Sequence, residues 1–229
     1  MPLMKTAAIL SEKGGVGKTI VTVHLGVAAH LAGLDVAIID LDPQASAAEW
    51  ADQRGEGRKP EAVTIPPARL DKLLADLRAS GTDLVLIDTP REANNAGYIA
   101  ATAADFVLIP FRRGGFDFRA LKRTLDLCRV ANKRPSVLLN GLRIGATRVE
   151  ADAREALAAK IQQLEHECDI APVVVHDRAA YVTASITAQT AQETDPASDA
   201  AAEIGALFSW LCAQLELSTT PQRDTKAVA

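Results

Sequence analysis

A glycine-rich segment near the N-terminus constrains the fold of this chain more strongly than any other feature. It reads SEKGGVGKT over residues 11–19 and precedes a stretch of helical character over 18–32 that ends at Gly33. The apolar run before it, residues 4–10, has the character of a strand. A strand, a glycine-rich turn and a helix in this order are typical of the first unit of an α/β sheet.

The rest of the chain repeats this alternation of apolar and helical stretches. The runs VAIID and LVLID are apolar until a final Asp, and such runs suit parallel strands that are buried on both faces. The expected further strands span 36–40, 84–88, 106–110, 137–140 and 172–175, and the expected helices span 69–79, 116–130, 148–168 and 197–217. The prediction is an α/β protein with a mostly parallel twisted sheet, helices on both faces and right-handed crossovers.

Length and composition limit the number of domains and the class of protein. The composition, with 48% hydrophobic and 24% charged residues, is ordinary for a globular protein. The length of 229 residues predicts a single domain, over residues 1–217. Residues 218–229 are expected to form a disordered tail. Neither a transmembrane span nor a secretory signal is expected, so the predicted location is cytoplasmic. The net charge of −4 excludes a strongly basic overall field. The cysteines and histidines lack metal-ligand spacing.

The glycines, lysine and threonine of segment 11–19 predict a phosphate-binding loop. Glycines allow a turn whose backbone N–H groups point inward, and the N-terminus of the following helix adds to this anion site. We expect Lys18 to reach the β- and γ-phosphates and Thr19 to ligate Mg²⁺ through its hydroxyl. The predicted cofactors are therefore ATP and Mg²⁺. The loop residues expected to bind the nucleotide are Gly14, Gly15, Val16, Gly17, Lys18 and Thr19.

Two of the predicted strands end in an aspartate, Asp40 and Asp88. The C-terminal ends of parallel strands line the ligand crevice of such sheets, so both carboxylates are expected beside the phosphate loop. Asp88 has the Walker B position and is expected to hold Mg²⁺ through water, while Asp40 is expected to tether its loop or a Mg²⁺-bound water. The predicted metal site therefore consists of Thr19, Asp40 and Asp88.

The phosphate loop departs from the ordinary pattern at one position. Glu12 stands where the ordinary loop has its first glycine, and Lys13 follows it directly. The resulting sequence KGGVGKT resembles the deviant phosphate loop of the ParA/MinD superfamily of ATPases, closest to small single-domain ParA proteins. The resemblance covers about residues 4–215 and implies a P-loop NTPase fold of the deviant Walker A type. It also implies that Lys13 crosses a dimer interface to the phosphates of the partner's nucleotide.

Further segments extend the resemblance and imply further site residues. The DLDPQ stretch is similar to the family's first switch, in which Asp42 orients the attacking water or assists with Mg²⁺. Asn140 occupies the place of an asparagine that contacts adenine. Residues 178–184 and 190–196 resemble two more family segments, and Ala188 stands where the family often has glycine. The implied catalytic residues are Lys13, Lys18 and Asp42.

The resemblance implies an ATPase of plasmid or chromosome partition. ATP would hold two subunits as a homodimer, the dimer would bind DNA of the nucleoid non-specifically, and a ParB-like centromere-binding activator would stimulate an otherwise slow hydrolysis. No operator-binding domain is expected ahead of the first strand. The tail lacks the bulky apolar residues of a membrane-binding helix, so no membrane contact is expected. The expected location is cytoplasmic and nucleoid-associated.

Basic residues on one helical face are the candidates for DNA contact, although a solvated basic face explains them equally well. The residues first predicted to bind DNA are Arg112, Arg113, Arg119, Lys122 and Arg123, and further candidates are Lys133, Arg134, Arg143, Arg148, Arg154 and Lys160. Two alternatives to DNA partition stay open. One is a positioning ATPase for protein cargo, and the other is a metabolic ATP-dependent ligase or synthetase on the same scaffold.

Overall fold

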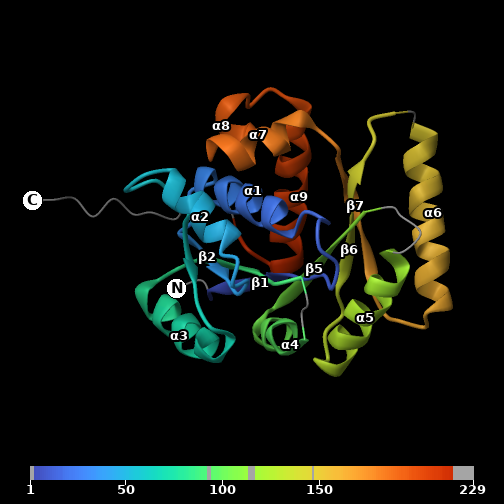
Figure 1. Cartoon of the computed structure of the whole chain (residues 1–229), viewed down its shortest axis with the longest axis horizontal. Coiled ribbons are helices and arrows are strands. Elements are labelled where there is room, and N and C mark those ends of the chain that lie inside the picture. The colour runs from blue at the N-terminus through green and yellow to red at the C-terminus, as the bar shows by residue number, and fades with distance from the viewer. Residues whose placement is uncertain (1–2, 92–93, 113–116, 146, 219–229) are drawn as a thin grey trace, which may run out of the picture.

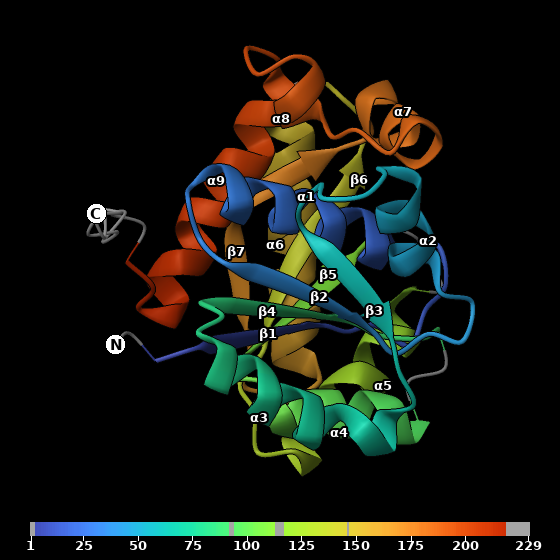
Figure 2. The ribbon, with the colours of Figure 1, turned by 90° about the vertical axis from the view of Figure 1, so that its left-hand side faces the viewer.

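The computed structural model describes residues 3–91, 94–112, 117–145 and 147–218. Within these residues a seven-stranded sheet has the order β3-β2-β4-β1-β5-β6-β7, and each pairing is parallel (Figure 2). The strands are β1 (Lys5–Ile9), β2 (Val36–Asp40), β3 (Glu61–Thr64), β4 (Leu84–Asp88), β5 (Phe106–Phe111), β6 (Ser136–Leu142) and β7 (Asp169–His176). The predicted parallel sheet is confirmed.

Helices cover both faces of this sheet, as predicted. One face carries α1, α2, α7, α8 and α9, and the other carries α3, α4, α5 and α6 (Figures 1 and 2). Their bounds are α1 (Lys18–Leu31), α2 (Ser46–Gln53), α3 (Leu70–Ser80), α4 (Asn94–Ala103), α5 (Asp117–Val130), α6 (Thr147–Gln163), α7 (Ala179–Thr187), α8 (Ala191–Thr194) and α9 (Asp199–Leu215). A short 3₁₀ helix, Pro67–Arg69, leads into α3.

The sheet separates two hydrophobic cores because successive side chains of a strand point to opposite faces. In β1, Ala7 and Ile9 belong to the core under α1 and α9. Ala8 and the following Leu10 belong to the core under α3, α4 and α5. Burying one large aliphatic side chain contributes about 1.5–3 kcal/mol. Strands with two buried faces therefore need the uninterrupted apolar runs seen in the sequence.

The expected helix ends agree with the structure at α1 and α5 and differ at α6 and α9. Gly33 has φ 86°, and the next amide, of Leu34, donates to the Ala29 carbonyl over 3.1 Å, which closes α1 as predicted. The helix expected over 148–168 ends earlier, at Gln163, because the chain turns at Glu165 with φ 52° and continues as β7. The last helix likewise ends at Leu215, before Glu216 adopts φ 52°.

Several short elements were not predicted from the sequence, namely α2, β3, α4, α7 and α8. The expected disordered tail lies outside the described residues apart from Ser218, and the expected domain boundaries stay a prediction. Among the described helices, none combines the length and apolar character needed to cross a bilayer.

Candidate nucleotide-binding site

Three strand ends meet at one edge of the sheet and carry the polar residues singled out by the sequence. In the register of the sheet, Asp88 of β4 lies between Asp40 of β2 and Ile9 of β1. The Thr89 hydroxyl donates to the Ile9 carbonyl over 2.8 Å and so joins the loop after β4 to the start of the phosphate loop. This shared edge brings together residues that are 80 positions apart in the sequence.

The phosphate loop between β1 and α1 depends on glycines with left-handed backbone. Gly15 has φ 75° and Gly17 has φ 91°, and residues other than glycine rarely adopt these backbone angles. Gly17 also faces Asn140 so closely that a Cβ atom there would overlap the Asn140 amide. No side chain caps the first turn of α1 in the described part of the chain. Its N–H groups are therefore available to an anion.

Lys18 begins α1 and lies beneath the loop. Its side chain is buried, and Nζ donates to the carbonyl oxygens of Ser11 at 3.2 Å and Lys13 at 3.4 Å. Burial lowers the pKa of Lys18, while the carboxylates of Asp88 and Asp42 oppose that shift. A buried ammonium held by neutral carbonyls favours an anionic partner, and a phosphate group supplies one.

Thr19 and Asp88 form the part of the site that fits a magnesium ion. The Thr19 hydroxyl donates to Oδ2 of Asp88 over 2.6 Å. The other carboxylate oxygen, Oδ1, is buried and has no hydrogen-bond partner among the described residues. Burial raises the pKa of Asp88 to about 7, although the hydrogen bond from Thr19 opposes the shift. Mg²⁺ is usually bound by one or two protein oxygens together with phosphates and water, and this pair offers such a set.

Asp40 braces the loop that follows β2. Its Oδ1 accepts from the Asp42 amide at 2.9 Å and its Oδ2 accepts from the Ala47 amide at 2.8 Å. Burial raises the pKa of Asp40, and these hydrogen bonds oppose the shift. Asp42 is half-buried and accepts from the Gln44 amide at 3.0 Å. Asp40 therefore holds the loop in shape, while Asp42 lies close enough to influence Lys18.

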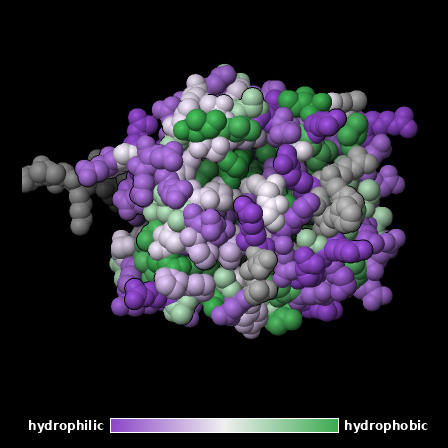
Figure 3. Space-filling model, viewed as in Figure 1, coloured by the Kyte–Doolittle hydropathy of each residue, from purple (hydrophilic) through white to green (hydrophobic). Residues whose placement is uncertain are grey.

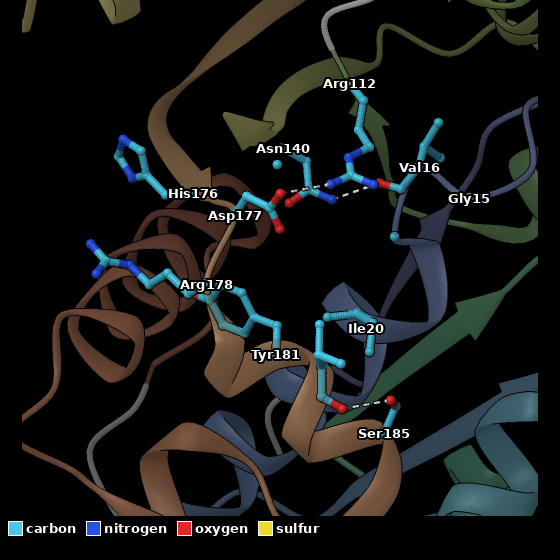
Figure 4. Close-up of a pocket in the computed structure, with 13 residues that line it drawn as sticks. Gly15, Val16, Ile20, Arg112, Asn140, His176, Asp177, Arg178, Tyr181 and Ser185 are labelled. Atoms are coloured by element: carbon cyan, nitrogen blue, oxygen red, sulfur yellow. Dashed lines mark hydrogen bonds and ion pairs between the residues drawn. The ribbon is translucent and has the colours of Figure 1, made fainter. Parts of the chain in front are cut away.

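A pocket of about 290 Å³ opens beside the phosphate loop (Figure 4). Its lining includes Gly15, Val16, Gly17, Ile20, Arg112, Asn140, Asp177, Tyr181, Val182 and Ser185. Asn140 donates from Nδ2 to the Val16 carbonyl over 2.6 Å, so it ties β6 to the phosphate loop. At the rim, the Arg112 guanidinium lies 3.6 Å from the Asp177 carboxylate. The combination of Ile20 and Tyr181 with polar rim groups suits a flat, partly apolar ring next to a phosphate site.

Glu203 of α9 supports the far wall of this pocket and was not predicted from the sequence. Its carboxylate accepts from Arg178 Nε and Nη2 at 2.9 and 2.8 Å and lies 2.6 Å from His176 Nδ1. The Tyr181 hydroxyl is 2.9 Å from the same carboxylate. His176 and Arg178 point away from the cavity (Figure 4). The sequence singled out Arg178 and Tyr181 by resemblance, but nothing near Glu203 marks it as their partner.

Trp50 of α2 and Arg54, which directly follows this helix, connect α2 to the helices α7 and α8 beside the pocket. The indole of Trp50 donates to the Ala184 carbonyl of α7 over 2.9 Å. Arg54 forms a two-pronged salt bridge with Glu193 of α8, at 2.7 and 2.9 Å, and stacks on Trp50 at 4.6 Å. The Arg54 side chain is only 3% exposed. These contacts span more than 130 residues of sequence, and no local signal predicts them.

The basic residues predicted for DNA contact lie in several different settings. Arg112 belongs to the pocket rim, and Arg113 lies outside the described residues. On α5, Arg119 is exposed, Lys122 pairs with Asp126 at 2.7 Å, and Arg123 pairs with Glu12 at 2.6 Å. Neighbouring carboxylates thus offset part of the positive charge on this face. A DNA-binding role for these residues stays a prediction.

The fold and the site together define a P-loop nucleotide-binding protein. A parallel sheet, a left-handed glycine turn, an uncapped helix N-terminus and the Thr19–Asp88 pair meet at one edge. Residues 7–191 match the model of the CobQ/CobB/MinD/ParA nucleotide-binding domain family. The chain belongs to this family, so the resemblance stated from the phosphate loop is confirmed.

Individual relatives agree with this assignment. The chain is 36% identical over 124 residues to the maintenance of carboxysome distribution protein A of Gloeobacter kilaueensis, covering 53% of this chain and 55% of that protein. It is 29% identical over 192 residues to the chromosome-partitioning ATPase Soj of Thermus thermophilus, covering 69% and 74%. The match spans about half the length of the first of these curated relatives.

The structural comparison supports the fold. The solved MinC:MinD cell division protein complex of Aquifex aeolicus contains a chain that superposes with a TM-score of 0.71. The alignment covers 96% of this chain and 99% of that chain, at 21% sequence identity. The whole arrangement of strands and helices is therefore shared, and the predicted P-loop fold is confirmed.

Proposed function

We propose that this chain is a ParA-type ATPase that binds ATP with Mg²⁺ at the phosphate loop and hydrolyses it slowly. The observation that carries the proposal is the hydrogen bond of Thr19 to the buried Asp88 beside the uncapped N-terminus of α1. A hydroxyl, an unsatisfied carboxylate oxygen and a set of unpaired amides favour a metal-bound triphosphate over an uncharged ligand. Mg²⁺, when bound there, neutralises charge on the β- and γ-phosphates.

The side chains of the site would act mainly by positioning. Lys18 would leave the carbonyls of Ser11 and Lys13 for the β- and γ-phosphates, and Thr19 would turn its hydroxyl oxygen toward the metal. Asp42, on the loop braced by Asp40, would orient a water molecule for attack. Without a strong base fixed in line with the terminal phosphate, hydrolysis is expected to be slow until a partner orders the loop.

ATP-dependent dimerisation is the next part of the proposal. Lys13 would reach the phosphates of the nucleotide in a second copy, as the resemblance implies. The exposed surface beside the pocket supports a contact on this side, since Val182 and Ile186 of α7 are 60% and 73% exposed. Apolar surface is exposed over α7 (Figure 3). Apolar side chains beside a ligand pocket favour a protein partner over permanent exposure to water.

Partition of a plasmid or chromosome is the cellular function that we infer. The dimer would bind nucleoid DNA non-specifically in the cytoplasm, and a ParB-like activator would trigger hydrolysis and release. A second candidate, positioning of protein cargo, is favoured by one observation, the relative named for carboxysome distribution. The same nucleotide site would serve either cargo. A ligase or synthetase would need a further substrate pocket, and none of the described residues specifically favours that alternative.

Calorimetry of the purified chain with Mg·ATP tests the nucleotide-binding proposal. We expect saturable binding by the natural chain and a loss of at least about tenfold in affinity for Lys18→Ala, because the variant lacks a charge-assisted hydrogen bond. Lys72→Ala, which removes an exposed lysine of α3, is the matched control and is expected to bind normally. Absence of binding by the folded natural chain would contradict the proposal.

A further inference from the structure

Arg91 lies at the edge of the phosphate loop, three residues after the end of β4. Thr89, which precedes it, is buried, and its hydrogen bond to the Ile9 carbonyl fixes where this loop leaves the sheet. The segment after β4 therefore begins next to the phosphate loop, and Arg91 lies beside that loop. The sequence analysis assigned no role to this residue.

The stem of Arg91 lies against the backbone of Gly14. A Cβ atom at position 14 would lie 2.8 Å from Cδ of Arg91 and 3.3 Å from both Cγ and Nε. The first glycine of the loop thus leaves space that the arginine side chain fills. Gly15 differs from Gly14 in this respect, because its need for glycine comes from a left-handed backbone alone. This packing places Nε of the guanidinium beside the loop, while the residue as a whole stays exposed.

Arg91 and Lys18 are both cations beside this loop. Nε of Arg91 lies next to the backbone of Gly14, and Nζ of Lys18 donates to the Lys13 carbonyl. Within the described residues, no acidic side chain forms a salt bridge with Arg91. Arg123, by contrast, contacts the same loop and is paired with Glu12 at 2.6 Å. Two cations that repel each other next to an anion-binding turn are stabilised when an anion lies between them.

We propose that Arg91 binds the terminal phosphate of the triphosphate held by the phosphate loop of its own chain. This inference rests on the proposed function and adds a residue that distinguishes ATP from ADP. The Thr19–Asp88 pair marks the metal side of the site, where the β- and γ-phosphates lie. Arg91 follows Asp88 by three positions on this side. A guanidinium presents a planar fork of donors that matches two phosphate oxygens, which an ammonium does not.

Titration of the chain with Mg·ATP and with Mg·ADP tests the role of Arg91. Protein concentrations at which sedimentation shows monomers keep a partner subunit out of the measurement. We expect Arg91→Ala to weaken ATP binding about tenfold or more and ADP binding less than about twofold, because only ATP has the γ-phosphate. The ATP affinity of Arg91→Lys is expected to lie between those of the natural chain and Arg91→Ala. Lysine keeps the positive charge but lacks the planar set of donors of a guanidinium.

The matched control is Arg78→Ala, which removes an exposed arginine of α3 and is expected to change neither affinity. Unchanged ATP affinity in Arg91→Ala would overturn the inference, and so would an equal loss for ATP and ADP. A loss that occurs only when dimers form would also overturn it, because Arg91 would then act on the nucleotide of the partner. Failure of the natural chain to bind ATP would instead contradict the proposed function itself.

Discussion

Glu12 explains how this phosphate loop keeps its shape without its first glycine. The Glu12 carboxylate pairs with Arg123 at 2.6 Å, and its backbone amide donates to the Thr124 hydroxyl over 3.1 Å. Both partners lie on α5, so the loop is attached to a helix of the opposite layer. Arg123 is 59% exposed, and an exposed ion pair contributes at most about 1 kcal/mol. The contacts of Glu12 with Arg123 and Thr124 therefore act mainly by fixing the direction in which the loop begins.

His24 of α1 is a buried histidine in a neutral state behind the pocket wall. Its Nδ1 donates to the Ile20 carbonyl over 2.8 Å, and its ring meets Tyr181 edge to face at 5.1 Å. The other ring nitrogen, Nε2, is buried without a partner among the described residues. Burial lowers the pKa of His24 to about 4, from an ordinary value of 6.5. Protonation inside the fold is therefore unfavourable.

Acid is expected to destabilise the protein partly through His24. The unfolded chain takes up this proton near pH 6.5, and the folded chain only near pH 4. The contribution of neutral His24 to the free energy of unfolding is therefore complete above pH 6.5 and is lost as the pH falls from 6.5 to 4. The natural chain should lose about 2–3 kcal/mol more than His24→Gln between pH 7.5 and 4.5. Urea unfolding at several pH values measures this difference. The control is His30→Gln, an exposed histidine of the same helix, and equal pH dependence in all three proteins would contradict the assignment.

At the scale of elements, the short helix α2 connects two halves of the site. It follows the loop of Asp40 and Asp42, and Trp50 and Arg54 attach it to α7 and α8. Arg54 also donates to the carbonyls of Ala188 and Lys59, at 2.8 and 2.9 Å. Arg54 is thus a single buried cation that joins α2, α8 and the segment before β3.

Arg54→Ala is expected to lower the free energy of unfolding by about 3 kcal/mol, because it leaves Glu193 partly buried without its partner. Burial would raise the pKa of Glu193, but the hydrogen bonds from Arg54 and Thr190, together with the Arg54 charge, lower the pKa below the ordinary 4.5. The contribution is therefore present above pH 4.5 and is lost as the pH falls through the lowered pKa. Chemical unfolding of both proteins at pH 7 measures the loss of stability in Arg54→Ala, and unfolding below pH 4 shows whether the difference between the two proteins shrinks.

An exposed ion pair provides the comparison for Arg54. Lys59 pairs with Glu61 at 2.7 Å, but these side chains are 39% and 75% exposed. Lys59→Ala is therefore expected to cost less than about 1 kcal/mol. Equal effects of the two substitutions would show that the Arg54–Glu193 contact does not stabilise the fold more than a surface pair does.

The sequence predicted the central strands well and the short elements poorly. β2 and β4 match their expected bounds because burial on both faces requires apolar residues at each position. β3 was missed because it lies at the sheet edge and is largely exposed, with the sequence EAVT. The helix α2 has only eight residues, too few for a helical period to stand out.

The phosphate side of the site was predictable for a related reason. The residues of the loop are adjacent in sequence, and Asp40 and Asp88 are each marked by the end of an apolar run. Glu203 and Arg54 have no such mark, since their partners are brought to them by packing of distant helices. Ala188 is an intermediate case. It has φ 53°, which explains why glycine suits the position that the resemblance singled out.

At the scale of the whole molecule, the proposed switch depends on two subunits meeting over bound ATP. Lys13→Gln is expected to leave ATP binding largely intact while preventing ATP-dependent dimers, because the variant keeps Lys18 and loses the cation assigned to the partner's phosphates. Sedimentation with a non-hydrolysable ATP analogue measures the dimers. DNA affinity should fall by at least about tenfold, since a dimer presents each basic surface twice.

Two comparisons make this expectation specific. Lys72→Gln changes an exposed lysine of α3 by the same substitution and is expected to dimerise normally. DNA co-sedimentation at two salt concentrations should weaken steeply at the higher one if phosphate contacts dominate. Dimers of unchanged stability in Lys13→Gln would remove Lys13 from the interface.

The order in which the site is assembled follows from the position of Glu203 in the last helix. The ends of β1, β2 and β4 carry the residues of the phosphate site. The ribosome synthesises these strands more than a hundred residues before α9. A nascent chain can therefore complete its anion-binding turn while His176, Arg178 and Tyr181 still lack their common acceptor. Synthesis proceeds at about 5–20 residues per second, so several seconds separate the two events. Under the proposed function, newly made protein would bind the phosphates of a nucleotide before its pocket for the base is complete.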